Sequence, residues 1–220
     1  MKKLTFLILA AMLTMASNAQ KITVTESRED IGGGSHNALI VEVYGADAKD
    51  VEKALKSKMK DYGAKVSNNK GELFGNNAII KDMGPKYMDL YGRVEDKKDE
   101  VRVIVAFDLG GAFLNSSDHH DQYKAAERIL HDFAYNLTKE ALDYQLKTQQ
   151  KALDKLNGEQ KDLVKENTNL NNQITDYQNR IKKNQDAIEK NKEDQAAKQK
   201  EIAQQQQVVD EAGKKAKSVE

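Results

Sequence analysis

The stretch that decides the architecture is residues 146–188, LKTQQKALDKLNGEQKDLVKENTNLNNQITDYQNRIKKNQDAI. Apolar side chains recur in it with the heptad spacing of a coiled coil. With Leu146 at heptad position a, the same register continues to Ala216 without a skip. Eight of the eleven a positions are apolar, as are five of the ten d positions. We therefore predict a coiled-coil tail over residues 138–220.

The expected contact line of this tail, here called the seam, predicts its partner. Leucine at d with β-branched residues at a favours two parallel helices, so we expect a parallel homodimer. The e positions are mostly Gln and Asn, so attractive charge pairs between g and e are scarce. Seam asparagines would penalise pairing out of register. The seam residues are Leu146, Leu153, Leu156, Leu163, Asn167, Leu170, Ile174, Tyr177, Ile181, Ile188, Ile202 and Val209.

Two alternatives to this tail stay open. Many a and d positions are polar, which leaves room for a solvated single helix or a disordered tail. Asn157-Gly158 is a candidate turn, which would make a helical hairpin. The heptad crosses this dipeptide in register, and this favours one helix from Asp121 to about Ala216.

Residues 20–137 have the composition of a folded head. Eleven of the thirteen glycines lie at or before Gly111, Pro85 is the only proline, and Tyr177 is the only aromatic residue beyond Tyr144. Turn formers and large apolar anchors are what a compact domain with loops needs. Alternation and helical spacing predict the elements of this head. They are a strand at 21–25, a flexible glycine loop at 31–37, a strand at 39–43, a helix capped by Asp47 and ended by Gly63, a hairpin at 64–81, strands at 87–95 and 101–109, and a helix capped by Ser117 or Asp118.

This order predicts an α+β fold. We expect a small antiparallel sheet with two helices on one face, ferredoxin-like or TATA-binding-protein-like, followed by the long α-helical coiled coil. The first helix should bury Val51, Leu55, Met59 and Tyr62.

The first nineteen residues predict export. Lys2 and Lys3 precede an apolar run, and Ser17-Asn18-Ala19 supplies the small residues of a signal-peptidase site, so cleavage would leave Gln20 first. An uncleaved anchor is the weaker alternative; after cleavage we expect no membrane insertion. The location is then periplasmic or secreted. The chain has no cysteine, which excludes a lipoprotein anchor and disulfides. The chain has 35 basic and 35 acidic residues, a balance that gives no electrostatic reason to bind nucleic acid.

We interpret the histidines and the glycine triplet as ordinary structural residues and not as a metal site or a phosphate loop. His119 and His120 are adjacent, and His131 lies about three helical turns away, so the histidines do not have metal-ligand spacing. Gly32-Gly33-Gly34 lacks the Lys and Ser/Thr of a phosphate loop. We therefore predict a protein that is not an enzyme, with no catalytic residue, no metal and no cofactor. Four apolar residues lie near glycines: Leu73, Phe74, Phe113 and Leu114. We expect them to pack at the edges of the core; the alternative is a surface that contacts a partner protein.

The run VRVIVAFDLGGAF at 101–113, followed by DQYKAAE at 121–127 and the heptads, resembles uncharacterised secreted proteins of the Bacteroidetes. The signal ending Ser17-Asn18-Ala19-Gln20 is similar to theirs, and the resemblance implies export but no activity. Three functions remain: a structural or scaffolding protein, a periplasmic chaperone or envelope-assembly factor, and a small-ligand-binding head tethered by a coiled coil. We expect the first, with a protein of the cell envelope open as a further partner.

Overall fold

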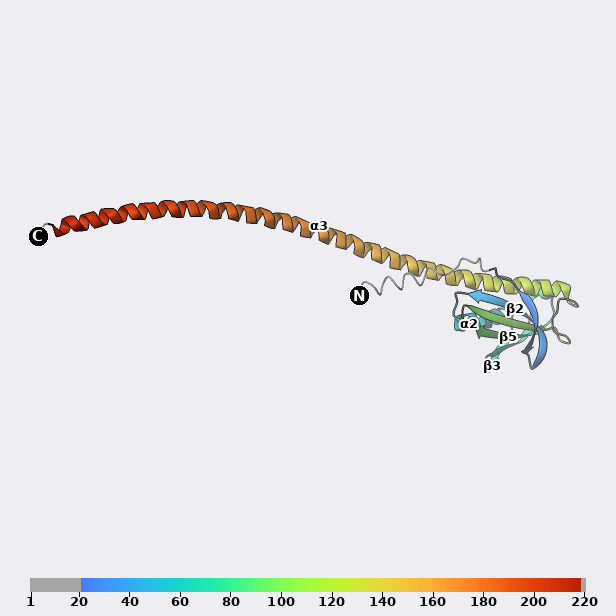
Figure 1. Ribbon diagram of the computed structural model, residues 1–220. Helices are drawn as coiled ribbons and strands as arrows, with labels where there is room; N and C mark the ends of the chain where they lie inside the picture. Colours follow the sequence, from blue (N-terminus) through green and yellow to red (C-terminus); the bar gives the residue numbers. More distant parts are fainter. Residues whose placement is uncertain (1–20, 219–220) are drawn as a thin grey trace. The chain divides into compact units, whose positions relative to one another are not determined.

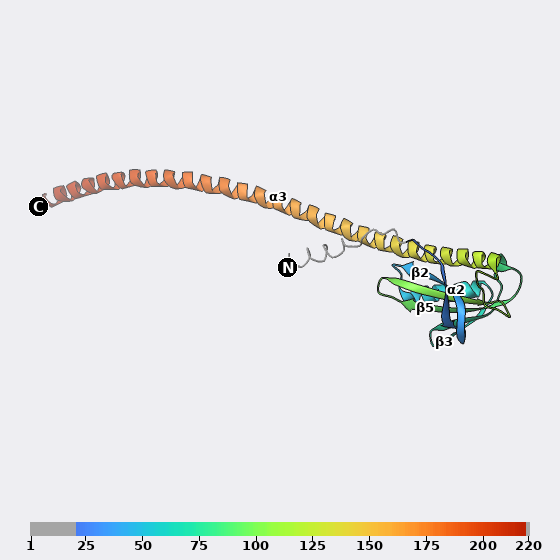
Figure 2. The same cartoon turned by 45° about the vertical axis from the view of Figure 1, so that its right-hand side comes forward.

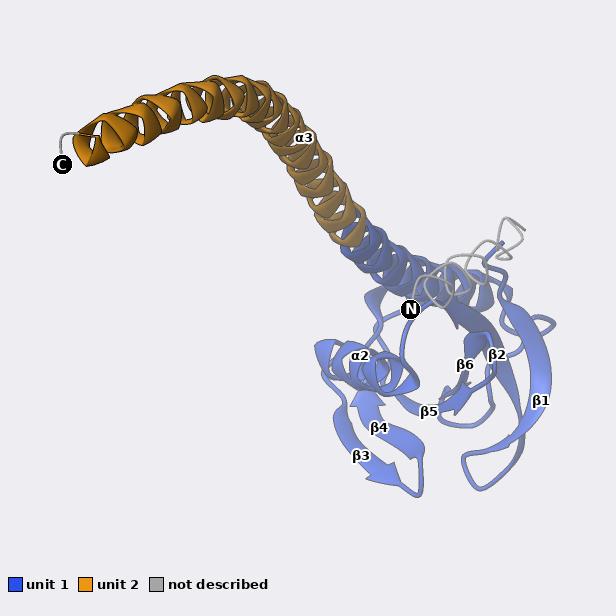
Figure 3. Cartoon of the chain, turned by 60° about the vertical axis from the view of Figure 1, so that its left-hand side comes forward, with its two compact units in different colours: residues 1–150 blue, residues 151–220 orange. Residues whose placement is uncertain are grey.

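The computed structural model describes residues 21–218, so the predicted signal peptide lies outside the described residues. The chain divides into two compact units, 1–150 and 151–220 (Figure 3). The elements in chain order are β1 (Thr25–Ile31), β2 (Gly34–Tyr44), α2 (Ala48–Asp61), β3 (Lys65–Asn69), β4 (Glu72–Ala78), the 3₁₀ turn η2 (Lys81–Met83), β5 (Met88–Asp96), β6 (Glu100–Asp108) and α3 (His120–Lys217) (Figure 1).

Unit 1 contains one six-stranded antiparallel sheet in the order β1-β2-β6-β5-β4-β3. One face of the sheet holds the main core, which includes Val41, Leu90 and Val103. Helix α2 and the first part of α3 lie beside the sheet (Figures 1 and 2). From α3 the core receives Ala126, Leu130 and other side chains. The prediction of an α+β fold followed by a long helix is confirmed.

The opposite face of the sheet also carries a small apolar cluster. Ile31, Ile40 and Ile104 are buried there, with Tyr91 and Phe113 packed against them. Consecutive residues of β6 are therefore buried on both faces, which goes beyond the single core face that alternation predicted.

The start of the chain differs from the prediction. Residues 21–24 form no strand, and the residues predicted as a flexible loop belong to the β1–β2 hairpin. Gly32 and Gly33 have φ values of 66° and 80°, the two positive values that a tight type I′ turn requires. Glycine thus fixes the turn here. The strand was missed because its sequence, TESREDI, has almost no apolar alternation.

Helix α2 agrees with its sequence signals. The Asp47 side chain accepts a hydrogen bond from the Lys49 amide at 2.9 Å, which confirms the N-cap. At the other end, the amides of Gly63 and Ala64 donate to the carbonyls of Lys60 and Met59, which is a Schellman motif around a left-handed glycine. Val51, Leu55 and Met59 are buried as predicted, whereas Tyr62 is the C-cap and only half-buried.

Gly92 of β5 allows α2 to approach the sheet closely. A Cβ atom at this position would lie 2.7 Å from Met59 Cε and 2.9 Å from Leu55 Cδ2. Without a side chain, β5 leaves room for both helix residues in the main core.

The predicted hairpin at 64–81 is confirmed as β3 and β4, with a register irregularity between Gly75 and Ala78. The predicted cap of the last helix is wrong: α3 begins at His120, and the Tyr123 amide donates to the His119 carbonyl. The Asn115 side chain instead accepts from the amides of Ser117 and Asp118, so these residues form a turn before the helix.

Candidate self-association surface

Helix α3 exposes an apolar line along its length. Its last buried side chain is Thr138, whose hydroxyl accepts a hydrogen bond from the Tyr44 amide at 3.1 Å. Every described residue of unit 2 is exposed. The apolar seam residues are half-exposed or more, from 50 % for Leu153 and Leu170 to 68 % for Leu146, and Asn167 is exposed as well. These side chains have no covering partner within the described residues of one chain.

The helix is unbroken through the candidate turn. Asn157 and Gly158 both lie inside α3, so the helical hairpin is wrong and the single helix is confirmed. Glycine in a helix interior costs about 1 kcal/mol relative to alanine. Side-chain contacts one turn apart support the helix on its polar faces, including Lys155–Glu159 at 3.7 Å and Lys192–Glu189 at 2.7 Å.

The polar seam residue Asn167 is held by its own helix. Asn171 Nδ2 donates to Asn167 Oδ1 at 2.9 Å and to the Asn167 carbonyl at 3.0 Å. The amide group of Asn167 therefore keeps a defined orientation at an a position. The side-chain NH₂ group of Asn167 can donate a hydrogen bond to an acceptor on a second helix.

The apolar character of the seam is uneven. From Leu146 to Ile188 nine of the thirteen a and d positions are apolar. Beyond Ile188 four of the eight a and d positions are polar: Asn191, Gln195 and Lys198 precede Ile202, and Gln205 separates Ile202 from Val209. The first part of the line therefore offers most of the apolar surface.

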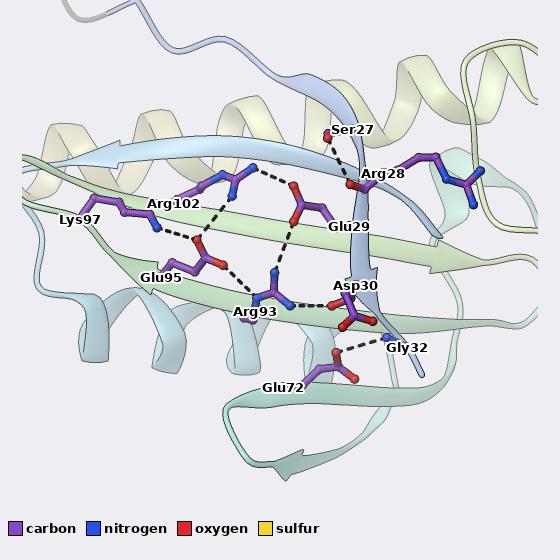
Figure 4. A network of polar contacts seen from close by, with 10 residues as sticks. All are labelled: Ser27, Arg28, Glu29, Asp30, Gly32, Glu72, Arg93, Glu95, Lys97 and Arg102. Carbon is purple, nitrogen blue, oxygen red and sulfur yellow. Dashed lines mark hydrogen bonds and ion pairs between the residues drawn. The ribbon is translucent and has the colours of Figure 1, made fainter. Parts of the chain in front are cut away.

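A charged network occupies the outer face of the sheet in unit 1 (Figure 4). Glu29 of β1 bonds to Arg102 Nη2 at 2.8 Å and to Arg93 Nη2 at 3.4 Å. Glu95 pairs with the same two arginines and with Lys97. These ion pairs link β1 to β5 and β6, so they hold β1 against the outer face of the sheet. The Lys97 hydrogen bond is the largest cause that lowers the pKa of Glu95; burial opposes it, and the charges of Lys97 and Arg93 add to it.

Four aromatic rings follow one another beside this network. The Phe113 and His36 rings stack at 3.7 Å, and Tyr91 lies between Phe113 and Phe74 at 6.0 Å and 5.0 Å. Phe74 and Phe113 are half-buried, whereas Leu73 and Leu114 are fully buried in the main core. These four predicted patch residues thus separate onto two faces of the sheet, and they form no single surface.

A groove lies between α2 and α3 in unit 1. Its volume is about 760 Å³, and each helix contributes side chains at positions i, i+3, i+4 and i+7. Small residues, such as Ala46, Ala54 and Ala141, keep it open. Towards the other end, bulky side chains such as Met59 and Phe133 leave only about 20 Å³. The lining residues of the groove are Gly45, Ala46, Asp47, Asp50, Lys53, Ala54, Ser57, Leu137, Glu140, Ala141, Tyr144 and Gln145.

The histidines stay apart from any ligand cluster. His119 accepts the Asn115 amide through Nδ1 at 3.4 Å, and His131 contacts Asp132 and the Tyr135 ring. Among residues 21–218, no group of three or more His, Cys, Asp or Glu side chains is placed to hold a metal ion. Over the same range, no helix combines the length and apolarity needed to cross a bilayer.

Comparison with known proteins adds no relative. No protein-family model, no curated protein and no solved structure matches the chain.

Proposed function

We propose that this chain is an exported, non-enzymatic structural or scaffolding protein that self-associates through its C-terminal helix as a parallel coiled-coil dimer. The observation that carries the proposal is the exposed apolar seam on an unbroken helix. In proteins most of the stability of a helix comes from packing of its apolar face, so an uncovered apolar face calls for a partner. A second copy offers the same line in the same register.

The exposed surface is large enough to drive association. Full burial of a leucine or isoleucine gains about 1.5–3 kcal/mol, so the half-exposed seam residues gain roughly 1 kcal/mol each. The eleven apolar members then supply on the order of 10 kcal/mol per helix. The burial free energy of the two helices together exceeds the free-energy cost of association, which is about 4–15 kcal/mol.

Residue types along the seam favour the parallel arrangement. Ile174, Ile181 and Ile188 occupy consecutive a positions, while Leu156, Leu163 and Leu170 occupy consecutive d positions. This combination favours two parallel strands. In a parallel pair Asn167 meets its own copy, where each amide can donate to the other.

The head is the part we propose for recognition at the end of the dimer. Export rests on the predicted signal at 1–19, and an envelope protein stays the proposed class of further partner. Within the α+β class we favour the TATA-binding-protein-like alternative. A ferredoxin-like β-α-β-β-α-β order would place a strand after the second helix, whereas none follows α3 among the described residues.

The test uses the chain from Gln20, which contains no cysteine. Light scattering after size exclusion should give twice the chain mass. Ile181→Cys, at an a position, should form a symmetric disulfide on mild oxidation, because a positions of a parallel pair meet in register. Asn179→Cys, on the outer face of the same turn, is the matched control. A monomeric mass in light scattering would refute the proposal. A dimer in which Ile181→Cys stays unlinked would indicate an antiparallel pair.

A second candidate function is a tethered ligand-binding head, and the groove between α2 and α3 favours it. Its volume lies within the range of about 300–1,000 Å³ that small-molecule sites occupy. Apolar Leu137 and Ala141 share its wall with Asp50, Lys53 and Glu140. Ala54→Trp should fill the groove without touching the seam. Unchanged binding of a candidate ligand by this variant would exclude the groove as its site.

A further inference from the structure

Within unit 1, α3 has one face that is buried in the main core and another face that exposes apolar side chains. Leu130, Phe133 and Ala134 are buried in the main core. Tyr135 is 50 % exposed and Leu142 is 45 % exposed. At 100° per residue, Tyr135 lies about half a turn from the row of Leu130, Phe133 and Leu137. Tyr135 therefore lies on the side of α3 that faces away from the main core, whereas Leu142 lies at the edge of the head, where its Cδ2 atom is 3.3 Å from the position that a Cβ atom of Gly45 would take.

These two residues extend the heptad of the seam upstream. With Leu146 at a, both Leu142 and Tyr135 occupy d positions, and Lys139 occupies the a position between them. A single lysine at a is tolerated in coiled coils. Lys139 Nζ lies 3.7 Å from the Asp143 carboxylate on the same helix, so its charge has a partner while its aliphatic stem stays available for packing.

The local structure marks where this extension ends. Arg128 and Asp132 occupy the preceding d and a positions, and both are charged and exposed. The Tyr135 ring stacks with His131 at 6.3 Å and an interplanar angle of 7°, which restrains its side chain. Tyr135 is thus the first apolar residue of the heptad line.

We infer that the coiled coil of the dimer begins inside the head, at Tyr135, so that the two heads contact each other back to back through α3. The occupant of this face is a second copy of the chain, because the face continues the seam in one register. This inference rests on the proposed function. Leu137, Ala141 and Tyr144 lie on the opposite side of α3, so the groove of each head stays uncovered in this arrangement.

The experiment compares two tyrosines on opposite faces of α3 in the full chain from Gln20. Tyr135→Cys occupies d, and Tyr144→Cys is the control, because Tyr144 is 73 % exposed and lies on the groove side. Under the same mild oxidation, Tyr135→Cys should form roughly tenfold more disulfide-linked dimer, since d positions meet in a parallel pair.

Ile181→Cys separates this inference from the proposed function. If Ile181→Cys links and Tyr135→Cys does not exceed Tyr144→Cys, the coiled coil starts after the head and the inference is overturned. If Ile181→Cys also stays unlinked, the parallel dimer fails and the inference fails with it. Linkage at both Ile181 and Tyr135, with little at Tyr144, supports contact between the heads.

Discussion

Truncation of one isoleucine should weaken the proposed dimer by a measurable amount. Ile181 is 57 % exposed in one chain, so its burial in the dimer gains about 1 kcal/mol per helix. Ile181→Ala removes most of that gain from both copies, a loss of about 2 kcal/mol. Such a loss raises the Kd for dimerisation about 30-fold. Alanine is the best helix former, so the substitution does not weaken the helix itself.

Sedimentation equilibrium over a range of chain concentrations would measure this Kd. The matched control is Asn179→Ala, which makes the same kind of truncation two residues away on the outer face of α3. It should leave the Kd within about twofold, because surface substitutions usually change free energies by less than 0.5 kcal/mol. Equal effects of the two variants would refute the assignment of Ile181 to a buried contact line.

Three further predictions concern stability. Glu29→Gln removes two ion pairs, to Arg93 and Arg102, and should lower the free energy of unfolding by about 1 kcal/mol in urea titration; no change would show that β1 is held by other contacts. Gly158→Ala should raise the thermal midpoint of the helix signal in circular dichroism, by about 1 kcal/mol per chain in stability, and a lower midpoint would contradict the helical interior at this position. The folded-state pKa of Glu95 is depressed below 4.5, so its stabilisation is present above that pH and is lost as the pH falls through the folded pKa; Glu95→Gln should therefore unfold with a weaker dependence on pH below about 4.5, and an identical pH dependence would contradict this.

The sequence predicted elements whose signals are local. Asp47, the stripe of Val51, Leu55 and Met59, and Gly63 lie within seventeen residues and specify α2 almost completely. The hairpin of β3 and β4 follows from its turn of Asn, Lys and Gly residues. The length of α3 followed from the unbroken heptad.

Features that depend on distant partners were missed. β1 has few apolar residues, and its position depends on Glu29 reaching arginines 64 and 73 residues away in the chain. The signal that could have indicated this network is the alternation of Arg93 and Glu95, which places both side chains on the face opposite Leu90. The groove was missed for a related reason. Small residues such as Ala54 and Ala141 reveal a gap only when two helices are known to lie beside each other.

The uneven apolar content of the seam has a kinetic consequence. The strongest contacts between two paired helices would lie between Leu146 and Ile188. Pairing should therefore start in this segment and then extend towards the C-terminus. Beyond Asn191 the pairing free energy per heptad is small, so these turns would open and close many times before the dimer dissociates. Amide hydrogen exchange would therefore be fast near Val209 and slow near Ile181. In the proposed dimer the C-terminal end of the coiled coil would then be a site of helix exchange, where a different helix could pair without prior separation of the two chains.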